Sequence, residues 1–186
     1  VAAEWMTKGY SEIDAHVANI ARFYDHSRTL THVRARTGES FNKMYGIVHP
    51  SEQYESVRNA RVSPFFARQQ ECGVIYFETA GWERPQWYQL NEKLLADYGD
   101  RVMPRSAEWD SRWWSPIINA EHLAMRERVG LVDLTAFSIF DFRGAGVLDY
   151  IQRMVVNQMN VNVGRAVYTP LLEPHGGFKA DLTIMR

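Results

Sequence analysis

The most regular alternation of apolar and polar residues lies near the C-terminal end of the sequence. Its even-numbered positions hold Phe178, Ala180, Leu182 and Ile184, and its odd-numbered positions hold Lys179, Asp181, Thr183 and Met185. The side chains of a strand point alternately to opposite faces, so this pattern predicts a strand with one apolar face. Asp181 is expected on the face opposite the apolar row.

A shorter apolar run, Val167–Leu172, comes just before this strand. The residues between the two runs are Glu173, Pro174, His175, Gly176 and Gly177. Proline fixes φ and glycine tolerates positive φ, so these residues favour a tight turn. The pattern therefore predicts a β-hairpin over residues 168–186, with Tyr168 on its first strand.

Apolar residues at helical spacing predict several helices in the first half of the chain. The first helix ends at Gly9, a residue type that is typical just past a helix C-terminus. A rougher helical face over residues 10–26 contains Ile13, Val17, Ile20 and Phe23. A further helix over residues 31–45 is expected to bury Val33, Phe41, Met44 and Tyr45 and to leave Arg34 and Arg36 in solvent.

Two more helices are predicted in the second half. One covers residues 120–129, with Asn119 as its N-cap and Gly130 at its end. Its apolar face contains Ile118, His122, Met125 and Val129, so His122 is interpreted as an interface residue and not as a catalyst. The other is an amphipathic helix marked by Val147, Ile151, Met154 and Val155.

Between these helices the pattern predicts strands over residues 73–78 and 138–143. Residues 81–88 are expected to form a corner held by large aromatic contacts, and residues 91–112 a polar connector. A mixture of helices with short strands and a hairpin predicts an α+β fold.

Composition narrows the class of protein. The 186 residues are 46% hydrophobic and carry a formal net charge of −1, so a packed core is expected and no nucleic acid or membrane partner is implied. No apolar run approaches the ~20 residues of a membrane span, which predicts a soluble chain. The single cysteine, Cys72, excludes an internal disulfide framework and favours a reducing compartment, either the cytoplasm or the mitochondrial matrix.

Several kinds of chemistry have no sequence signature here. The sequence contains no dinucleotide-binding, phosphate-loop or zinc motif, so no metal site is expected. Trp109, Trp113 and Trp114 could stack on a cofactor, but an apolar seam between domains is the simpler interpretation. Considered alone, Asp181 is an ordinary exposed acid on a strand.

The hairpin also resembles a known family. Its residues Tyr168–Leu172, Gly176–Gly177 and Asp181–Ile184 follow Glu121–Leu134 and Gly164–Ala166. In this order they are similar to the aminomethyltransferase family, which includes the T-protein of the glycine cleavage system. The resemblance implies that Tyr168 and Asp181 flank a bound tetrahydrofolate and that Asp181 is the acid of the chemistry. Ala180 departs from the pattern, because many simple aminomethyltransferases have a second Asp there.

The first half resembles a second group of proteins. Its Ala3–Trp5, Ile20–Phe23, His49–Pro50, Arg61–Pro64 and Gly81–Pro85 are similar to the central region of FAD-dependent dimethylglycine and sarcosine dehydrogenases. The resemblance implies three parts. Residues 1–22 are the tail of an FAD-binding oxidoreductase domain, residues 23–112 a central linking domain with its linker, and residues 113–186 the start of the folate-binding domain.

The function implied by these resemblances is oxidative demethylation of an N-methylated amine, such as dimethylglycine or sarcosine, with transfer of the one-carbon unit to tetrahydrofolate. FAD would be bound by a missing part of the protein, since the chain is expected to be a fragment whose partner is the rest of the same polypeptide. Two alternatives stay open: a non-catalytic regulatory or scaffold relative, and a folate-dependent aminomethyltransferase or demethylase. Oligomerisation also stays open.

Overall fold

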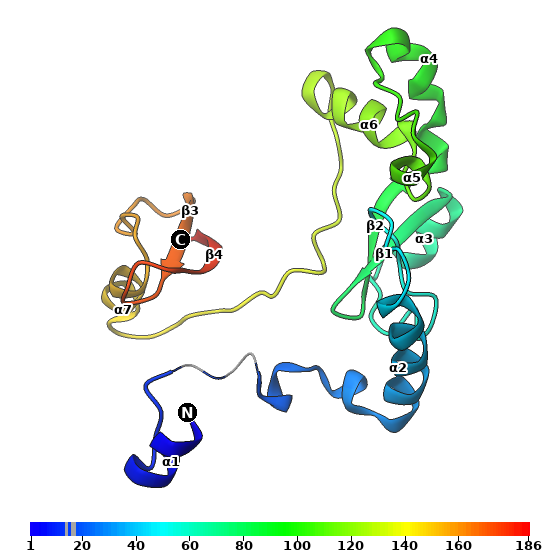
Figure 1. Ribbon diagram of the computed structural model, residues 1–186. Helices are drawn as coiled ribbons and strands as arrows, with labels where there is room; N and C mark the ends of the chain where they lie inside the picture. Colours follow the sequence, from blue (N-terminus) through cyan, green and yellow to red (C-terminus); the bar gives the residue numbers. More distant parts are fainter. Residues whose placement is uncertain (14, 16–17) are drawn as a thin grey trace. The chain divides into compact units, whose positions relative to one another are not determined.

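The computed structural model describes residues 1–13, 15 and 18–186 (Figure 1). The chain divides into two compact units, Val1–Phe137 and Ser138–Arg186. The described residues contain helices and two separate two-stranded antiparallel sheets, so the predicted α+β class is confirmed.

The helices and strands have the following bounds. The first unit contains α1 (Ala2–Lys8), η2 (Ile20–Arg22), η3 (Asp25–Arg28), α2 (Leu30–Met44), α3 (Phe66–Glu71), β1 (Val74–Thr79), β2 (Trp82–Tyr88), η4 (Gln89–Lys93), α4 (Leu94–Tyr98), η5 (Gly99–Arg101), α5 (Glu108–Ser111) and α6 (Pro116–Glu127). The second unit contains α7 (Val147–Met154), β3 (Ala166–Leu172) and β4 (Phe178–Met185). Among the described residues, no helix has both the length and the apolar character that a membrane crossing requires.

The first helix ends as predicted, because Gly9 follows α1 with a left-handed φ of 77°. The helix predicted over residues 10–26 does not form in the part of this range that the structure describes. Its described residues form no α-helix and include the short 3-10 turns η2 and η3, while Val17 lies outside the described residues. The Asn19 side chain accepts from the Ala21 N–H, and Phe23 is already extended, so the backbone turns once and stops.

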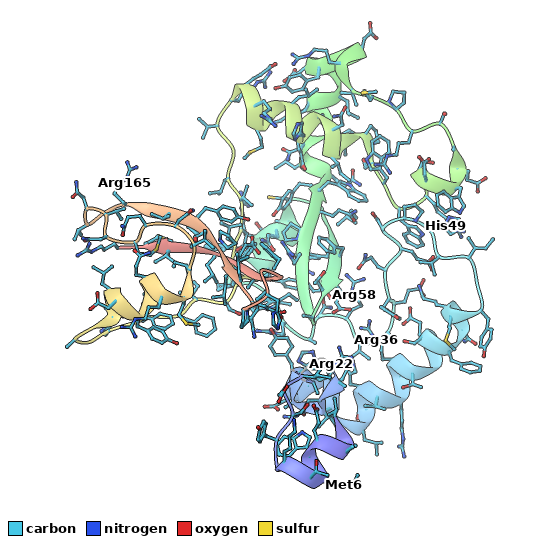
Figure 2. The ribbon with its side chains drawn as sticks, turned by 60° about the vertical axis from the view of Figure 1, so that its left-hand side comes forward. Met6, Arg22, Arg36, His49, Arg58 and Arg165 are labelled. Atoms are coloured by element: carbon cyan, nitrogen blue, oxygen red, sulfur yellow. The ribbon has the colours of Figure 1, made fainter. Side chains whose placement is uncertain are left out.

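The helix predicted over residues 31–45 is confirmed as α2, but the face expected to be buried is wrong. Its apolar residues Val33, Phe41, Met44 and Tyr45 are all exposed. Arg36, which was expected in solvent, is half-buried and pairs with Glu78 of β1. The polar side of α2 is the packed side because its charged residues find partners there: Arg36 pairs with Glu78 of β1, and Lys43 pairs with Glu52 in the segment before β1 (Figure 2).

The strand predicted over residues 73–78 is confirmed as β1, but the corner predicted over residues 81–88 is a strand, β2, paired with it. Pro85 lies beside a register shift between Ile75 and Tyr76. A proline lacks the N–H that a regular ladder needs, so an irregular position lets the strand continue through it. The turn itself lies at Ala80 and Gly81, which both have positive φ.

The main core of the first unit lies between α4 and α6. Leu94, Tyr98 and Ala120 are buried there, and Leu123 and Ala124 pack against them. The stretch expected to be a polar connector therefore contributes a core helix, because its two large apolar residues are four positions apart and face α6.

The start and end predicted for the helix after this stretch are also wrong. The helix α6 begins at Pro116 with Ser115 as its N-cap, whose side chain accepts from the Ile117 N–H. Asn119 lies within the helix and accepts from the Met103 N–H. The helix ends at Glu127, three residues before Gly130.

The strand predicted over residues 138–143 does not form. Phe140 and Phe142, which were expected to point inward, are 74% and 56% exposed. A strand needs a paired neighbour, and none of the described segments pairs with these residues. By contrast, the amphipathic helix after them is confirmed as α7, and the terminal hairpin is confirmed as β3 and β4.

Candidate functional site

The register of the β3–β4 hairpin decides which side chains share a face. Thr169 lies opposite Leu182, and Thr169 is completely buried. Tyr168 lies opposite Thr183, and Pro170 lies opposite Asp181 two positions further along the strands. Because side chains alternate along each strand, Tyr168 and Asp181 project from the same face as diagonal neighbours.

The structure brings the two predicted site residues into contact. The Tyr168 hydroxyl donates a hydrogen bond to Asp181 Oδ2 over 2.9 Å. The hydrogen bond and the carboxylate charge raise the pKa of the Tyr168 hydroxyl, so it remains a donor near neutral pH. Tyr168 is 65% exposed and Asp181 is also exposed, so an aromatic ring and a carboxylate stand together on an accessible surface.

The turn holds the two strands in this register. The Glu173 N–H donates to the Gly177 carbonyl oxygen over 2.7 Å, and the Gly176 N–H donates back to the Glu173 carbonyl over 2.8 Å. Gly176 has a φ of 82°, a value that most residues adopt only with strain. The glycine that the sequence analysis assigned to the turn is thus required by its backbone geometry.

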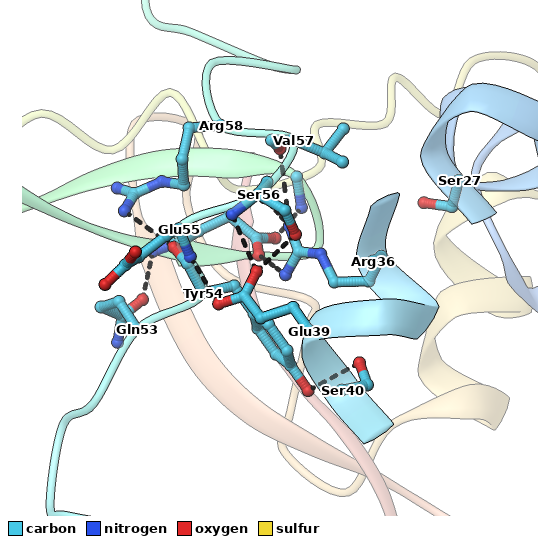
Figure 3. A network of polar contacts seen from close by, with 12 residues as sticks. Ser27, Arg36, Glu39, Ser40, Gln53, Tyr54, Glu55, Ser56, Val57 and Arg58 are labelled. Atoms are coloured by element: carbon cyan, nitrogen blue, oxygen red, sulfur yellow. Dashed lines mark hydrogen bonds and ion pairs between the residues drawn. The ribbon is translucent and has the colours of Figure 1, made fainter. Parts of the chain in front are cut away.

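A polar network in the first unit was missed by sequence reasoning (Figure 3). Glu39 of α2 accepts from the Ser56 hydroxyl and from the backbone N–H groups of Glu55 and Ser56. Burial opposes the charge on Glu39, but these hydrogen bonds outweigh it and lower its pKa to about 2. On the same helix, Arg36 donates to Glu78 and to the Ser56 carbonyl oxygen.

A second ion pair in this unit is deeper. The Glu83 side chain is fully buried and accepts from Arg58 and from the Asn59 N–H. Figure 2 shows Arg36 and Arg58 near each other beside the β1–β2 hairpin. These hydrogen bonds and ion pairs fix the 52–59 segment against α2 and β2. Only the three- and four-residue spacing of Arg36, Glu39 and Lys43 indicated a shared polar face.

A cavity of about 360 Å³ lies beside α3 and the end of β2 and is lined in part by Cys72, Tyr88 and Asp133. The Asp133 carboxylate is already used: it accepts from Gln69 over 2.7 Å and from Thr135. The Asp133 carboxylate is therefore held by protein donors and is not a free acid of this cavity. Within the described residues, no group of three or more His, Cys, Asp or Glu side chains could hold a metal ion.

The other candidates from the sequence belong to the first unit. His122 is exposed on α6. Trp109 contacts the His49 ring, whose Nδ1 lies 2.9 Å from the Trp109 carbonyl oxygen. Trp113 and Trp114 contact the guanidinium groups of Arg112 and Arg105. The three tryptophans therefore contact side chains of the first unit.

Two family models match the chain in sequence. Residues 8–63 match the FAD dependent oxidoreductase central domain, and residues 65–186 match the GCVT N-terminal domain. The order of these matches defines a class of protein in which an oxidoreductase segment is followed by an aminomethyltransferase-type segment. The chain belongs to the GCVT N-terminal domain family, whose model covers more than half of it. The resemblance seen in the motifs is therefore confirmed.

Individual relatives match nearly the whole of this chain. The chain is 31% identical over 185 residues to 4-methylaminobutanoate oxidase (formaldehyde-forming) of Paenarthrobacter nicotinovorans, covering 99% of this chain and 21% of that protein. It is 28% identical over 187 residues to the mitochondrial pyruvate dehydrogenase phosphatase regulatory subunit of Mus musculus, covering 99% and 21%. It is also 28% identical over 204 residues to mitochondrial sarcosine dehydrogenase of Mus musculus, covering 99% and 22%. The chain spans about a fifth of the length of these curated relatives, which include bacterial and mitochondrial proteins.

Proposed function

We propose that this chain is part of an FAD-dependent oxidoreductase that demethylates an N-methylated amine and passes the one-carbon unit to tetrahydrofolate at the β3–β4 hairpin. The observation that carries the proposal is the contact of the Tyr168 hydroxyl with Asp181 on an exposed strand face. The match to the oxidoreductase and GCVT models, in that order, supplies the class of reaction.

The exposed hairpin face suits a pterin. An aromatic ring offers a flat surface for stacking, and a carboxylate beside it accepts hydrogen bonds from ring N–H groups. When bound, tetrahydrofolate supplies the amine nitrogen that captures a one-carbon electrophile. Asp181 would hold the pterin, take up the proton that leaves this nitrogen, and stabilise positive charge that develops beside it.

Tyr168 has two tasks in this proposal. Its ring packs against the bound pterin, and its hydroxyl fixes the orientation of the Asp181 carboxylate through the 2.9 Å hydrogen bond. A carboxylate that is already oriented loses less conformational freedom when a ligand binds. Both side chains stand on neighbouring strands, which hold them more rigidly than loops would.

The oxidative step is assigned to residues outside this chain. FAD and the methylated amine would bind in the remainder of the same polypeptide. The compartment proposed for the protein is either the cytoplasm or the mitochondrial matrix. The domain limits at residues 22 and 112 remain a proposal. The name of the oxidase from Paenarthrobacter nicotinovorans supports an N-methylated amine as the substrate class.

Two alternatives differ in what the intact protein binds. The relative named as a phosphatase regulatory subunit favours a non-catalytic role for the same architecture. A stand-alone folate-dependent aminomethyltransferase is favoured by the GCVT match alone, but the oxidoreductase match over residues 8–63 speaks against it. A flavin absorption spectrum of the intact polypeptide separates this alternative from our proposal.

The decisive test compares Asp181→Asn with the unaltered intact polypeptide. Hydrogen bonds to a charged group contribute about 1.5–3 kcal/mol, so we expect the dissociation constant for tetrahydrofolate to rise by about 10- to 100-fold. Calorimetric titration measures the affinity. During turnover of the amine, the variant should release free formaldehyde where the unaltered protein forms methylenetetrahydrofolate.

Asp149→Asn is a matched control, because Asp149 is an exposed acid of the same unit that lies on α7. It makes the same change of charge away from the hairpin and should keep the affinity. If the unaltered polypeptide binds no tetrahydrofolate, the catalytic proposal fails and the regulatory alternative gains. Equal affinities of Asp181→Asn and the control would remove Asp181 from the site.

A further inference from the structure

One edge of β3 faces away from β4 and is held by a short segment, residues 155–159, that follows α7. Val155 forms a bridge with Leu171, and the Val156 N–H donates to the Pro170 carbonyl oxygen over 3.4 Å. The N and C=O of one strand residue point to the same side, so the missing N–H of Pro170 also falls on this edge. A proline is tolerated there because β4 needs no bond from it.

Asn157 makes the central contacts of this segment. Its side-chain Nδ2 donates to the Tyr168 carbonyl oxygen over 2.8 Å, and its backbone N–H donates to Thr169 Oγ1 over 3.1 Å. Its carbonyl oxygen accepts from the Gln152 side chain of α7 over 3.2 Å. One residue thus ties the strand to the helix directly at the backbone of Tyr168.

This attachment matters because the contact between Tyr168 and Asp181 is diagonal. Diagonal neighbours of an antiparallel pair lie about 7–8 Å apart at the backbone, and only a long side chain can bridge them. A small displacement of the Tyr168 backbone therefore lengthens the 2.9 Å hydrogen bond of its hydroxyl. The exposed ring has no surrounding core to restore its position.

We propose that Asn157 is a positioning residue for tetrahydrofolate binding: its side-chain amide fixes the Tyr168 backbone so that the ring and Asp181 present one ordered face. This inference rests on the proposed function of the hairpin. Asn157 itself lies at the outer edge of β3, so it acts through Tyr168 and touches neither the ligand nor Asp181.

The first test uses Asn157→Asp in the intact polypeptide, which keeps the size of the side chain and removes its N–H donor. A single neutral hydrogen bond contributes about 0.5–1.5 kcal/mol, so the dissociation constant for tetrahydrofolate should rise by about three- to tenfold. Asn162→Asp repeats the change of charge at an exposed asparagine of the same unit and should leave the affinity unchanged.

A stability control separates positioning from simple loosening of the unit. Met159 is 4% exposed and belongs to the same segment, so Met159→Ala destabilises the unit without removing the bond to Tyr168. For a positioning role, Met159→Ala lowers the melting temperature more than Asn157→Asp yet keeps the affinity within about twofold. An affinity that follows the melting temperature across both variants contradicts the inference.

A double-mutant cycle adds a readout that a structural role would not change. Tyr168→Ala removes the ring that Asn157 is proposed to position, so adding Asn157→Asp to it should cause no further loss of affinity. Additive losses in the double variant would show that Asn157 acts independently of Tyr168 and would overturn the inference.

A last measurement does not require folate binding. With 3-fluorotyrosine incorporated, the ¹⁹F signal of Tyr168, assigned through Tyr168→Phe, should shift on Asp181→Asn because its hydroxyl loses a charged partner. In the Asn157→Asp background that shift should shrink. If no tetrahydrofolate binds, the proposed function fails while this signal still decides the role of Asn157. An unchanged shift in the Asn157→Asp background refutes that role.

Discussion

Single residues differ sharply in how much they contribute to this fold, and the contrast is clearest for two arginine–glutamate pairs. Glu83 is fully buried at its side chain and holds both Arg58 and the Asn59 N–H. Glu71 pairs with Arg68 in solvent, with its side chain 62% exposed. An ion pair in solvent gains little, whereas removing one partner of a buried pair leaves the other uncompensated.

Glu83→Ala should therefore lower the free energy of unfolding by about 3–5 kcal/mol. The matched variant Glu71→Ala should lower it by about 1 kcal/mol or less. Urea unfolding of the two variants measures both values against the unaltered protein. Similar small losses would mean that water reaches the Glu83 carboxylate and that the pair is not buried in solution.

Glu39 predicts a pH dependence of stability. Its pKa falls from 4.5 to about 2 in the folded state, so the folded protein binds this proton less readily than the unfolded chain. The stabilisation is complete above the unfolded pKa of 4.5 and is lost as the pH falls toward about 2.

Glu39→Gln should remove this contribution. Relative to the variant, the unaltered protein should be more stable near neutral pH, and the difference should shrink as the solution is acidified below pH 4.5. Comparing the variant with the unaltered protein isolates Glu39 from the other carboxylates that titrate in the same range. A difference in unfolding free energy that stays constant with pH would assign the effect to packing instead.

At the level of elements, the terminal hairpin shows what a local sequence pattern can predict. Its turn chemistry and its alternation lie within 19 residues, and the structure has the strands, the turn and the face of Asp181 as expected. Both predicted site residues fall on this hairpin, where their side chains are in contact; it was the family resemblance, and not the alternation, that pointed to the pair. Their role in binding remains a proposal.

The elements that were predicted wrongly depend on partners that are distant in the sequence. The bounds of α2 follow from its own residues, but its inward face is set by Glu78 and the 52–58 segment, which a helical period cannot reveal. Residues 138–143 have a strand-like composition and no neighbour to pair with among the described segments. Asn157 was missed because an isolated asparagine carries no signal until the strand beside it is known.

For the whole molecule, the exposed surface is the informative quantity. The chain exposes 14267 Å², whereas two separate globular bodies of the sizes of the two units would expose about 11,000 Å² in total. Many large apolar side chains lie on this surface, among them Val129, Leu131 and Ile139, which are 100%, 99% and 87% exposed. An excess of roughly 3,000 Å² on one chain is at least as large as the share that one partner contributes to an obligate interface.

This excess supports the proposal that the remainder of a longer polypeptide packs on these residues. The 186-residue chain produced alone should then bind the dye ANS strongly and self-associate, because apolar patches of this size are covered in stable proteins. The intact polypeptide should bind little dye and unfold cooperatively. Analytical ultracentrifugation and dye fluorescence compare the two. A monomeric 186-residue chain that binds no dye and unfolds in one sharp transition would mean that its two units bury their apolar residues without further chain, and the proposed partner would lose its physical support.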